Sequence, residues 1–197
     1  MILREAIISD HKSVATVHFI TFQDFFLTKL GIEFLNIYYK SVIKSDNSIC
    51  ICAIENNSII GFITGCKVAK DFNKHLIFSN LLPFSLFAFK TLLTKPKSII
   101  RLIKNFSKIA NPSDDGYYSE IQSIAVLPDS KGKGVGEALI NEFEKKAKGH
   151  NLKKITLTTD YYDNDSVIGF YEKNGYNVYY DFVTYPNRRM YKLIKLL

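Results

Sequence analysis

Residues 117–149 of the chain read YYSEIQSIAVLPDSKGKGVGEALINEFEKKAKG, and this stretch decides the fold. Ile121 and residues 124–127 form a short apolar run that ends at Pro128, a pattern typical of a buried strand. From Val135 onward, apolar residues recur every three or four positions with charged residues between them, which predicts an amphipathic helix. Gly149 follows where a residue in the left-handed conformation would close that helix. The stretch therefore predicts a strand, a short loop and a helix.

The loop between strand and helix, KGKGVG at 131–136, predicts an anion site. The first N–H groups of a helix lack partners within it and carry a partial positive charge, so phosphate binds there. Glycine at every second position lets the backbone approach the anion and adopt positive φ. The P-loop pattern GxxxxGK followed by Ser or Thr is absent from the sequence, and GxGxG differs from the GxGxxG of dinucleotide-binding folds.

Two blocks of the sequence resemble one protein family. The segment from Val126 through Pro128 to Gly136 resembles the acetyl-CoA motif V-x-P-x-x-[R/K]-G-x-G-x-[G/A] of the GNAT superfamily of N-acyltransferases. The segment 164–176, NDSVIGFYEKNGY, is similar to that family's second block, N-x-x-A-x-x-F-Y-x-K-x-G-F. Valine and tyrosine replace the usual alanine and final phenylalanine of the second block.

The resemblance implies an α/β fold in which helices flank a central mixed, mostly antiparallel sheet. The length suits a single domain over residues 1–197. The resemblance is strong after residue 117 and weak before residue 67. Because the family usually joins its third and fourth strands by a short loop, residues 67–111 are expected to form a helical insertion there.

Hydrophobic spacing predicts the remaining elements. Ser9 or Asp10 caps a first helix, and the pair Asn56-Asn57 predicts the turn of a hairpin. The elements expected are a strand at 2–8, a helix after it, a second helix through 27–42, strands at 48–54 and 59–67, a strand at 154–159, a helix at 167–174, and strands at 177–183 and 189–196.

The insertion accounts for the basic character of the chain. Between residues 67 and 108, nine Lys or Arg stand against Asp71 alone, a net +8, whereas the whole chain is +7, which leaves −1 for the rest. Residues 81–94 are apolar on most sides, and 97–109 have one apolar and one basic face. Three interpretations stay open: a solvated surface, a platform for an anionic acceptor or CoA phosphate, and contact of 81–109 with an anionic membrane surface. No recognition motif supports nucleic-acid binding.

Composition sets further limits on the protein. With 47% hydrophobic residues the chain is expected to be globular. Its start is too short and too charged for a secretory signal, and no apolar run reaches the roughly 18 residues of a spanning helix, so a cytoplasmic location is expected. Cys50, Cys52 and Cys66 have no histidine cluster near them and are predicted to be core thiols rather than ligands of a metal. The sequence leaves open whether the protein forms a homodimer.

The resemblance assigns acetyl-CoA as cosubstrate and implies where it binds. The backbone amides from Gly132 to Glu137 would hold the pyrophosphate, and the central strand would pair with the pantetheine arm. Asn164 matches the family's amide contact to that arm, and a helix N-cap is its other interpretation. The expected cofactor-binding residues are Ile124, Ala125, Val126, Lys131, Gly132, Lys133, Gly134, Val135, Gly136, Glu137 and Asn164.

Two residues are predicted to move protons. Tyr171 matches the family's usual general acid, which protonates the departing thiolate; otherwise it packs against the arm. Glu120 lies on the central strand where several members carry a glutamate that acts as base through water; a salt-bridged surface glutamate is the alternative. Tyr118, Asp160 and Tyr161 are weaker candidates for the base.

The resemblance implies an N-acetyltransferase that moves acetyl from acetyl-CoA to a primary amine of a small molecule, with an amino sugar or a nucleotide-linked amino sugar as examples. Since the cysteines lie outside both motifs, direct attack in a ternary complex is the expected mechanism. A protein N-terminus or lysine is the alternative acceptor. The alternative of another class is a module that keeps the CoA fold without turnover and binds a membrane surface or a partner.

Overall fold

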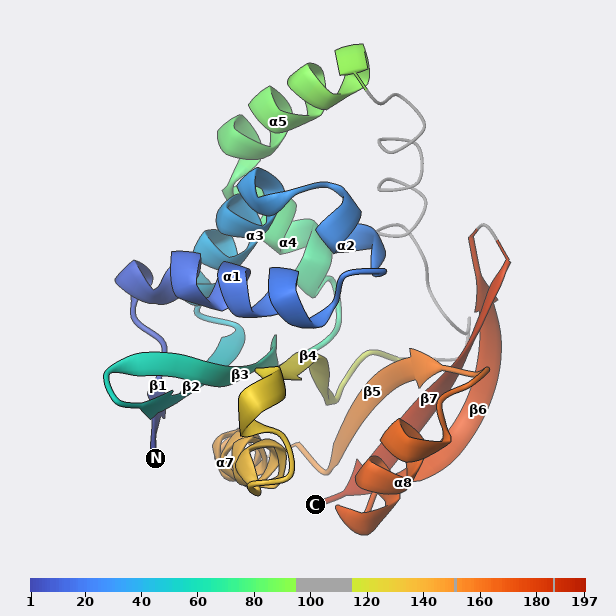
Figure 1. The fold of residues 1–197 in the computed structure, drawn as a ribbon. Helices are drawn as coiled ribbons and strands as arrows, with labels where there is room; N and C mark the ends of the chain where they lie inside the picture. The colour runs from blue at the N-terminus through green and yellow to red at the C-terminus, as the bar shows by residue number, and fades with distance from the viewer. Residues whose placement is uncertain (95–114, 151, 186) are drawn as a thin grey trace. The chain divides into compact units, whose positions relative to one another are not determined.

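The computed structural model describes residues 1–94, 115–150, 152–185 and 187–197 (Figure 1). The chain divides into two compact units. The first contains Met1–Lys67 and Ile121–Asn151, and the second contains Val68–Glu120 and Leu152–Leu197. The described residues of the two units contain seven strands and several helices, so the predicted mixed α/β class is confirmed.

The first unit is built on strands in the order β1 (Ile2–Glu5), β2 (Ser48–Glu55), β3 (Ser58–Cys66) and β4 (Ser119–Val126), of which the part from Ile121 on belongs to this unit. The β2–β3 hairpin is confirmed. Its turn residues Asn56 and Asn57 have φ of 49° and 61°, the positive values of a tight hairpin turn.

The first strand ends earlier than predicted, at Glu5 instead of residue 8. A 3₁₀ turn, η1 (Ile8–Asp10), follows it. The Asp10 carboxylate accepts hydrogen bonds from the Ile7 N–H at 2.8 Å and from the Arg4 guanidinium at 2.6 and 3.1 Å. The contact with Arg4 lowers the pKa of Asp10. Asp10 stands at the N-cap of the next helix, but its side chain closes this turn and does not cap that helix.

Helices cover both faces of the first unit's sheet. Figure 1 shows α1 (His11–Thr21) and α3 (Ile32–Lys44) on one face of β2 and β3, and α7 (Val135–Lys148) on the other. Strand β2 is therefore buried without a break from Ile49 to Ala53, where a strand with one solvated face would alternate. The apolar stripe of α7 is buried as predicted: Val135, Leu139, Ile140, Phe143 and Ala147.

Two predictions about helix ends in the first unit are wrong. The helix expected through 27–42 is two helices, α2 (Phe26–Lys29) and α3, because Gly31 between them adopts φ 98° and interrupts the helical turn. Gly149 is not left-handed. Its φ is −63°, and α7 closes by a hydrogen bond of 3.0 Å from the His150 N–H to the Ala147 carbonyl.

The second unit contains strands in the order β5 (Lys154–Asp160), β7 (Arg188–Leu196) and β6 (Asn177–Thr184), all antiparallel, together with α8 (Asp165–Lys173). These elements confirm the predictions for the chain after residue 154. Gly175 follows α8 with φ 83°. Cys50, Cys52 and Cys66, all in the first unit, are buried, as predicted, and form no disulfide.

The insertion begins with two helices, α4 (Phe72–Ser79) and α5 (Leu81–Thr94). Helix α5 was predicted, α4 was not, and the second insertion helix predicted at 97–109 lies outside the described residues. The two ends of the insertion are hydrogen-bonded to each other, from Ala69 N–H to Tyr118 O and from Lys70 N–H to Gly116 O, both at 2.9 Å. A Cβ at Gly116 would lie 2.9 Å from Lys70 Cα, so glycine permits this close approach.

A buried histidine links α1 to α3. His18 is 3% exposed, and its Nδ1 lies 2.6 Å from the Tyr39 hydroxyl. Among the described residues its Nε2 has no hydrogen-bond partner, so a charged imidazolium would bury an unsatisfied N–H. Burial lowers the pKa of His18 to about 4 and raises that of Tyr39.

We expect the free energy of unfolding to decrease as the pH falls, because His18 takes up a proton more readily in the unfolded chain than in the folded one. The unfolded pKa is near 6.5 and the folded one about 4, so the unfolded state binds a proton first as the pH falls. Between pH 8 and pH 5 the free energy of unfolding should decrease by about 2 kcal/mol from this group. Urea unfolding of wild type and His18→Asn at several pH values measures it. An equal pH dependence in both proteins would contradict it, because the other histidines are common to both.

Candidate functional site

The loop before α7 has the conformation expected of an anion site. It follows a 3₁₀ turn, η2 (Pro128–Ser130), and is exposed from Lys131 to Gly134. Gly132 and Gly134 have φ of 74° and 75°, and Gly134 is the N-cap of α7 in the left-handed conformation. A Cβ at either glycine would meet nothing within 4 Å. The requirement for glycine here is thus one of backbone conformation, and the space beside the backbone is open.

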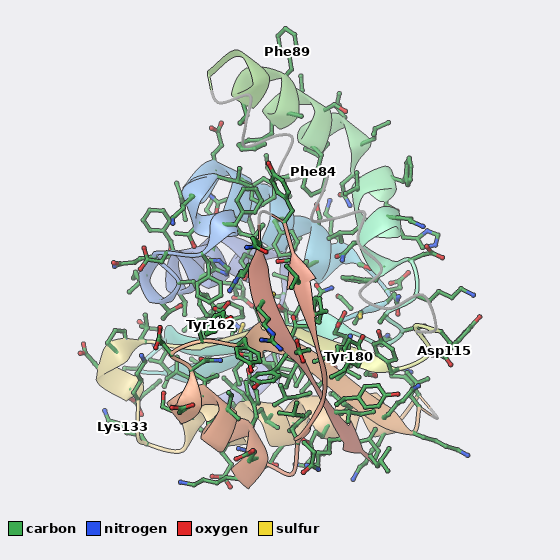
Figure 2. The ribbon with its side chains drawn as sticks, turned by 90° about the vertical axis from the view of Figure 1, so that its right-hand side faces the viewer. Phe84, Phe89, Asp115, Lys133, Tyr162 and Tyr180 are labelled. Carbon is green, nitrogen blue, oxygen red and sulfur yellow. The ribbon has the colours of Figure 1, made fainter. Side chains whose placement is uncertain are left out.

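The N–H groups of residues 132–137 point to no acceptor within the described residues, whereas the Lys131 N–H donates to Pro128 O at 3.2 Å. The first hydrogen bond of the helix runs from Ala138 N–H to Gly134 O at 3.0 Å. Within the described part of the chain, the N–H groups of residues 132–137 make no hydrogen bond. These unpaired donors stand at the positive end of the α7 dipole. Lys131 and Lys133 are exposed beside them, and Figure 2 shows Lys133 projecting from this loop.

Contacts within the first unit hold the start of α7 against the end of β4. The Leu127 N–H donates to Ile60 O at 2.8 Å. A Cβ on Gly61 would lie 2.9 Å from Ala125 O and 3.3 Å from Val135 Cγ1. Gly61 therefore lets β3, β4 and the first residue of α7 meet. The sequence analysis missed this residue, although a glycine inside a strand is a signal of close backbone approach.

The β4 residues predicted to pair with the pantetheine arm lie at this contact. Ala125 is buried, and Ile124 and Val126 are half-buried. Their pairing with a ligand stays a prediction.

In the second unit, Glu120 is engaged by a buried lysine. Its Oε1 accepts a hydrogen bond of 2.6 Å from Lys192 Nζ, and Lys192 is 3% exposed. The same Nζ donates to the Tyr118 hydroxyl at 3.1 Å and lies 4.5 Å from the centre of that ring. Glu120 is therefore salt-bridged, as one of its two interpretations predicted, but to a buried partner. Lys192 was not predicted, because nothing in the sequence distinguishes it from Lys195, the other lysine of β7.

Tyr171 lies on α8 with its ring buried among aromatic neighbours. It is 7% exposed, and its ring centre lies 5.3 Å from that of Phe170 and 5.9 Å from that of Tyr176. Burial raises the pKa of Tyr171, so the phenol stays protonated at neutral pH. Among the described residues its hydroxyl makes no hydrogen bond, which leaves the O–H available to a ligand.

Asn164 occupies the N-cap position of α8, yet its side chain does not cap the helix. Its Nδ2 donates to Thr159 Oγ1 at 2.7 Å and to Asp160 O at 2.9 Å. Since a backbone carbonyl only accepts, the contact with Asp160 fixes the orientation of the amide. The amide oxygen is therefore the group that a ligand N–H can reach.

The weaker base candidates hold other partners. Asp160 forms a bidentate salt bridge with Arg188, whose Nη2 lies 2.6 Å from Asp160 Oδ2. Tyr161 stacks on Tyr191 at 4.5 Å between ring centres, under the Arg189 guanidinium. These contacts favour structural roles for both residues. In the described part of the chain, no group of three His, Cys, Asp or Glu side chains is placed to bind a metal ion.

The structure thus places the predicted residues in two groups. The loop residues, Glu137 and the β4 residues lie in the first unit, and Glu120, Asn164 and Tyr171 lie in the second.

Comparisons with known proteins identify the family of the chain. The sequence pattern of the Acetyltransferase (GNAT) family matches residues 15–176. An acetyltransferase of Pectobacterium atrosepticum, ECA0875, is 42% identical over 62 residues, which span 32% of this chain and 43% of that protein. The chain thus matches less than half the length of this relative.

Solved structures of low sequence identity share the fold. Ribosomal-protein-alanine N-acetyltransferase from Brucella melitensis has a TM-score of 0.64 at 12% identity, with 100% of both chains covered. Aminoglycoside 6'-acetyltransferase type Ii has a TM-score of 0.64 at 15% identity, covering 100% of this chain and 97% of that one. PaiA N-acetyltransferase from Thermoplasma acidophilum, in complex with coenzyme A, has a TM-score of 0.56 at 15% identity, covering 100% and 98%.

Because the family pattern spans residues 15–176, most of the chain, the chain belongs to the GNAT acetyltransferase family.

Proposed function

We propose that this protein transfers acetyl from acetyl-CoA to a primary amine of a small molecule, by direct attack in a ternary complex. The observation that carries the proposal is the row of N–H groups from Gly132 to Glu137, which meet no acceptor within the described residues. A diphosphate offers several oxygens to several donors at once, and the helix dipole favours its charge. Lys131 and Lys133 add two mobile positive charges at the same place.

The pantetheine arm is proposed to follow the backbone of Ile124, Ala125 and Val126. An arm with alternating amide donors and acceptors can pair with a strand as another strand would. We assign the amide oxygen of Asn164 to an N–H of the arm, because its amide nitrogen already donates to Thr159 and Asp160.

Tyr171 is proposed as the donor to the leaving sulfur. A thiol has an ordinary pKa of about 8.5 and a phenol one of about 10, a difference equivalent to about 2 kcal/mol. The burial that raises the pKa of Tyr171 makes complete proton transfer to a thiolate still less favourable. We therefore expect the phenol to keep its proton and stabilise the developing thiolate by a hydrogen bond, and the thiolate to take its proton from solvent.

Glu120 is proposed as the general base acting through a water, which takes the amine proton and passes a proton on to the Glu120 carboxylate. The ammonium of Lys192 holds the carboxylate in one place, which makes Lys192 a positioning residue. A purely structural ion pair is the competing explanation, and the double variant described below separates the two.

The acceptor is proposed to be a small amine, with amino sugars and nucleotide-linked amino sugars tested first. The basic insertion supports an anionic conjugate as acceptor. Proteins of this fold include an aminoglycoside acetyltransferase and a ribosomal-protein-alanine acetyltransferase, so a protein N-terminus is the second candidate. A screen of amino sugars, polyamines, amino acids and peptides by release of the CoA thiol tests this choice.

Replacing Gly134 should weaken CoA binding. Valine is strained at φ 75°, so the loop would rotate and its N–H groups would no longer converge. We expect Gly134→Val to lower the affinity for CoA at least tenfold by calorimetry. Gly149→Val, at the other end of the same helix with φ −63°, is the matched control. Unchanged heats of binding in Gly134→Val, in a protein with wild-type thermal unfolding, would exclude the loop as the diphosphate site.

Removing the Tyr171 hydroxyl should slow turnover more than it weakens CoA binding. Tyr171→Phe is expected to lower kcat roughly 10- to 100-fold with less than threefold change in the Kd for CoA, because the hydroxyl acts on the leaving sulfur. Tyr176→Phe, a buried tyrosine in the same aromatic cluster, should stay within about twofold of wild type. Wild-type kcat in Tyr171→Phe would remove the assignment.

Separating Glu120 from Lys192 should distinguish catalysis from stability. Glu120→Gln leaves a buried ammonium uncompensated and should destabilise the fold by roughly 2–4 kcal/mol. It should also move the pH–rate profile to higher pH, since the amine must then lose its proton without a base. Adding Lys192→Met removes the stranded charge and should restore stability but not activity. Recovery of activity in the double variant would show that the pair is structural.

A further inference from the structure

We propose that the exposed face of α5, together with the end of α4, docks on an anionic lipid surface. This inference concerns where the protein works, and it goes beyond the acetyl transfer proposed above. It rests on five apolar side chains, here called the α5 patch: Phe78, Leu81, Leu82, Leu86 and Phe89.

Helix α5 is apolar on two opposite faces. One face is buried and contains Phe87 and Thr91, each 7% exposed. The other contains Leu82, Leu86 and Phe89 at spacings of four and three residues, and these side chains are 71%, 63% and 67% exposed. Figure 2 shows Phe89 pointing away from α5 on the side opposite to Phe84. A surface helix normally presents polar residues on its outer face, so packing within the described chain accounts for only one of the two faces.

The α5 patch continues onto α4. Phe78 near the end of α4 is 72% exposed, and Leu81 at the start of α5 is 55% exposed. Five large apolar side chains thus lie exposed within twelve residues of sequence, from 78 to 89. Contiguous patches of this kind mark binding surfaces rather than ordinary scattered exposure.

The sequence that contains the patch and follows it is basic, which favours an anionic occupant. The sequence from 67 to 108 contains nine Lys or Arg and one acid, Asp71, which already pairs with Lys74 at 2.8 Å. Each lysine or arginine near an anionic bilayer strengthens binding roughly fivefold. Apolar side chains bordered by basic residues are the composition of helices that lie in the lipid headgroup region.

The length of α5 fits a helix lying on a membrane. Its 14 residues extend about 21 Å, short of the roughly 30 Å hydrocarbon core. Nowhere in the described chain is a helix long and apolar enough to cross a bilayer. The hydrogen bonds from Ala69 to Tyr118 and from Lys70 to Gly116 close the base of the insertion. Changes on the outer face of α5 should therefore leave the fold and CoA binding intact.

Co-sedimentation of the full-length protein with vesicles tests the proposal. We expect binding to vesicles of phosphatidylglycerol and phosphatidylcholine, little binding to phosphatidylcholine alone, and weaker binding at high salt. Leu82→Asp with Phe89→Asp should lower the bound fraction at least tenfold. Val183→Asp, at a 57% exposed valine of β6, is the matched control and should bind as wild type does. Calorimetry with CoA on every variant reports folding independently of lipid.

Each other outcome overturns the proposal. Absence of binding to anionic vesicles, or undiminished binding of the α5 double variant, would exclude the patch as a lipid-docking surface. Equal binding to both lipid compositions would exclude the electrostatic part. Self-association that Phe89→Asp abolishes, without vesicle binding, would assign the patch to contact between copies of the chain. Since CoA binding is measured separately, failure of the acetyl-transfer proposal would leave this result unaffected.

Discussion

The loop proposed to bind an anion depends on a backbone conformation that L-residues with a Cβ adopt only with strain. Gly134 is the N-cap of α7 at φ 75°, and Gly132 has φ 74°. These values turn the chain so that successive N–H groups lie free at the positive end of a 14-residue helix. Neither glycine is crowded, since an added Cβ would meet nothing within 4 Å. The constraint is therefore torsional, and the open space beside the backbone is what an anion would occupy.

Packing in the first unit keeps these donors in place. The apolar stripe of α7 is buried against β2 and β3, and its first residue, Val135, sits beside Gly61. A glycine in the middle of β3 weakens the strand, but here it admits the carbonyl of Ala125 and the side chain of Val135. The position of the helix start thus depends on the sheet core as well as on the loop.

The side chains proposed for catalysis in the second unit include charges that lie far apart in the sequence. Lys192 is almost fully buried, and a buried ammonium requires a partner. Glu120 and Tyr118 supply it, so these residues form one cluster rather than separate candidates. Tyr171 differs, since its hydroxyl makes no hydrogen bond within the described chain and burial keeps it protonated. A fixed carboxylate and an available phenol suit different steps of acyl transfer.

Short-range spacing and backbone preferences were sufficient to predict the glycine loop, the buried stripe of α7, the Asn56-Asn57 turn and α5, because neighbouring residues decide these features. The predicted ends of several elements were wrong. Gly31 broke a predicted helix by its positive φ, Gly149 stayed right-handed, and Asp10 closed a turn with Arg4 instead of capping α1.

Two contacts could be seen only in the folded chain: Lys192 pairs with Glu120, 72 residues away, and Gly61 lies against Ala125 and Val135. The physical reason is that a side chain's partner across a sheet follows from strand order and register, which a linear pattern does not contain.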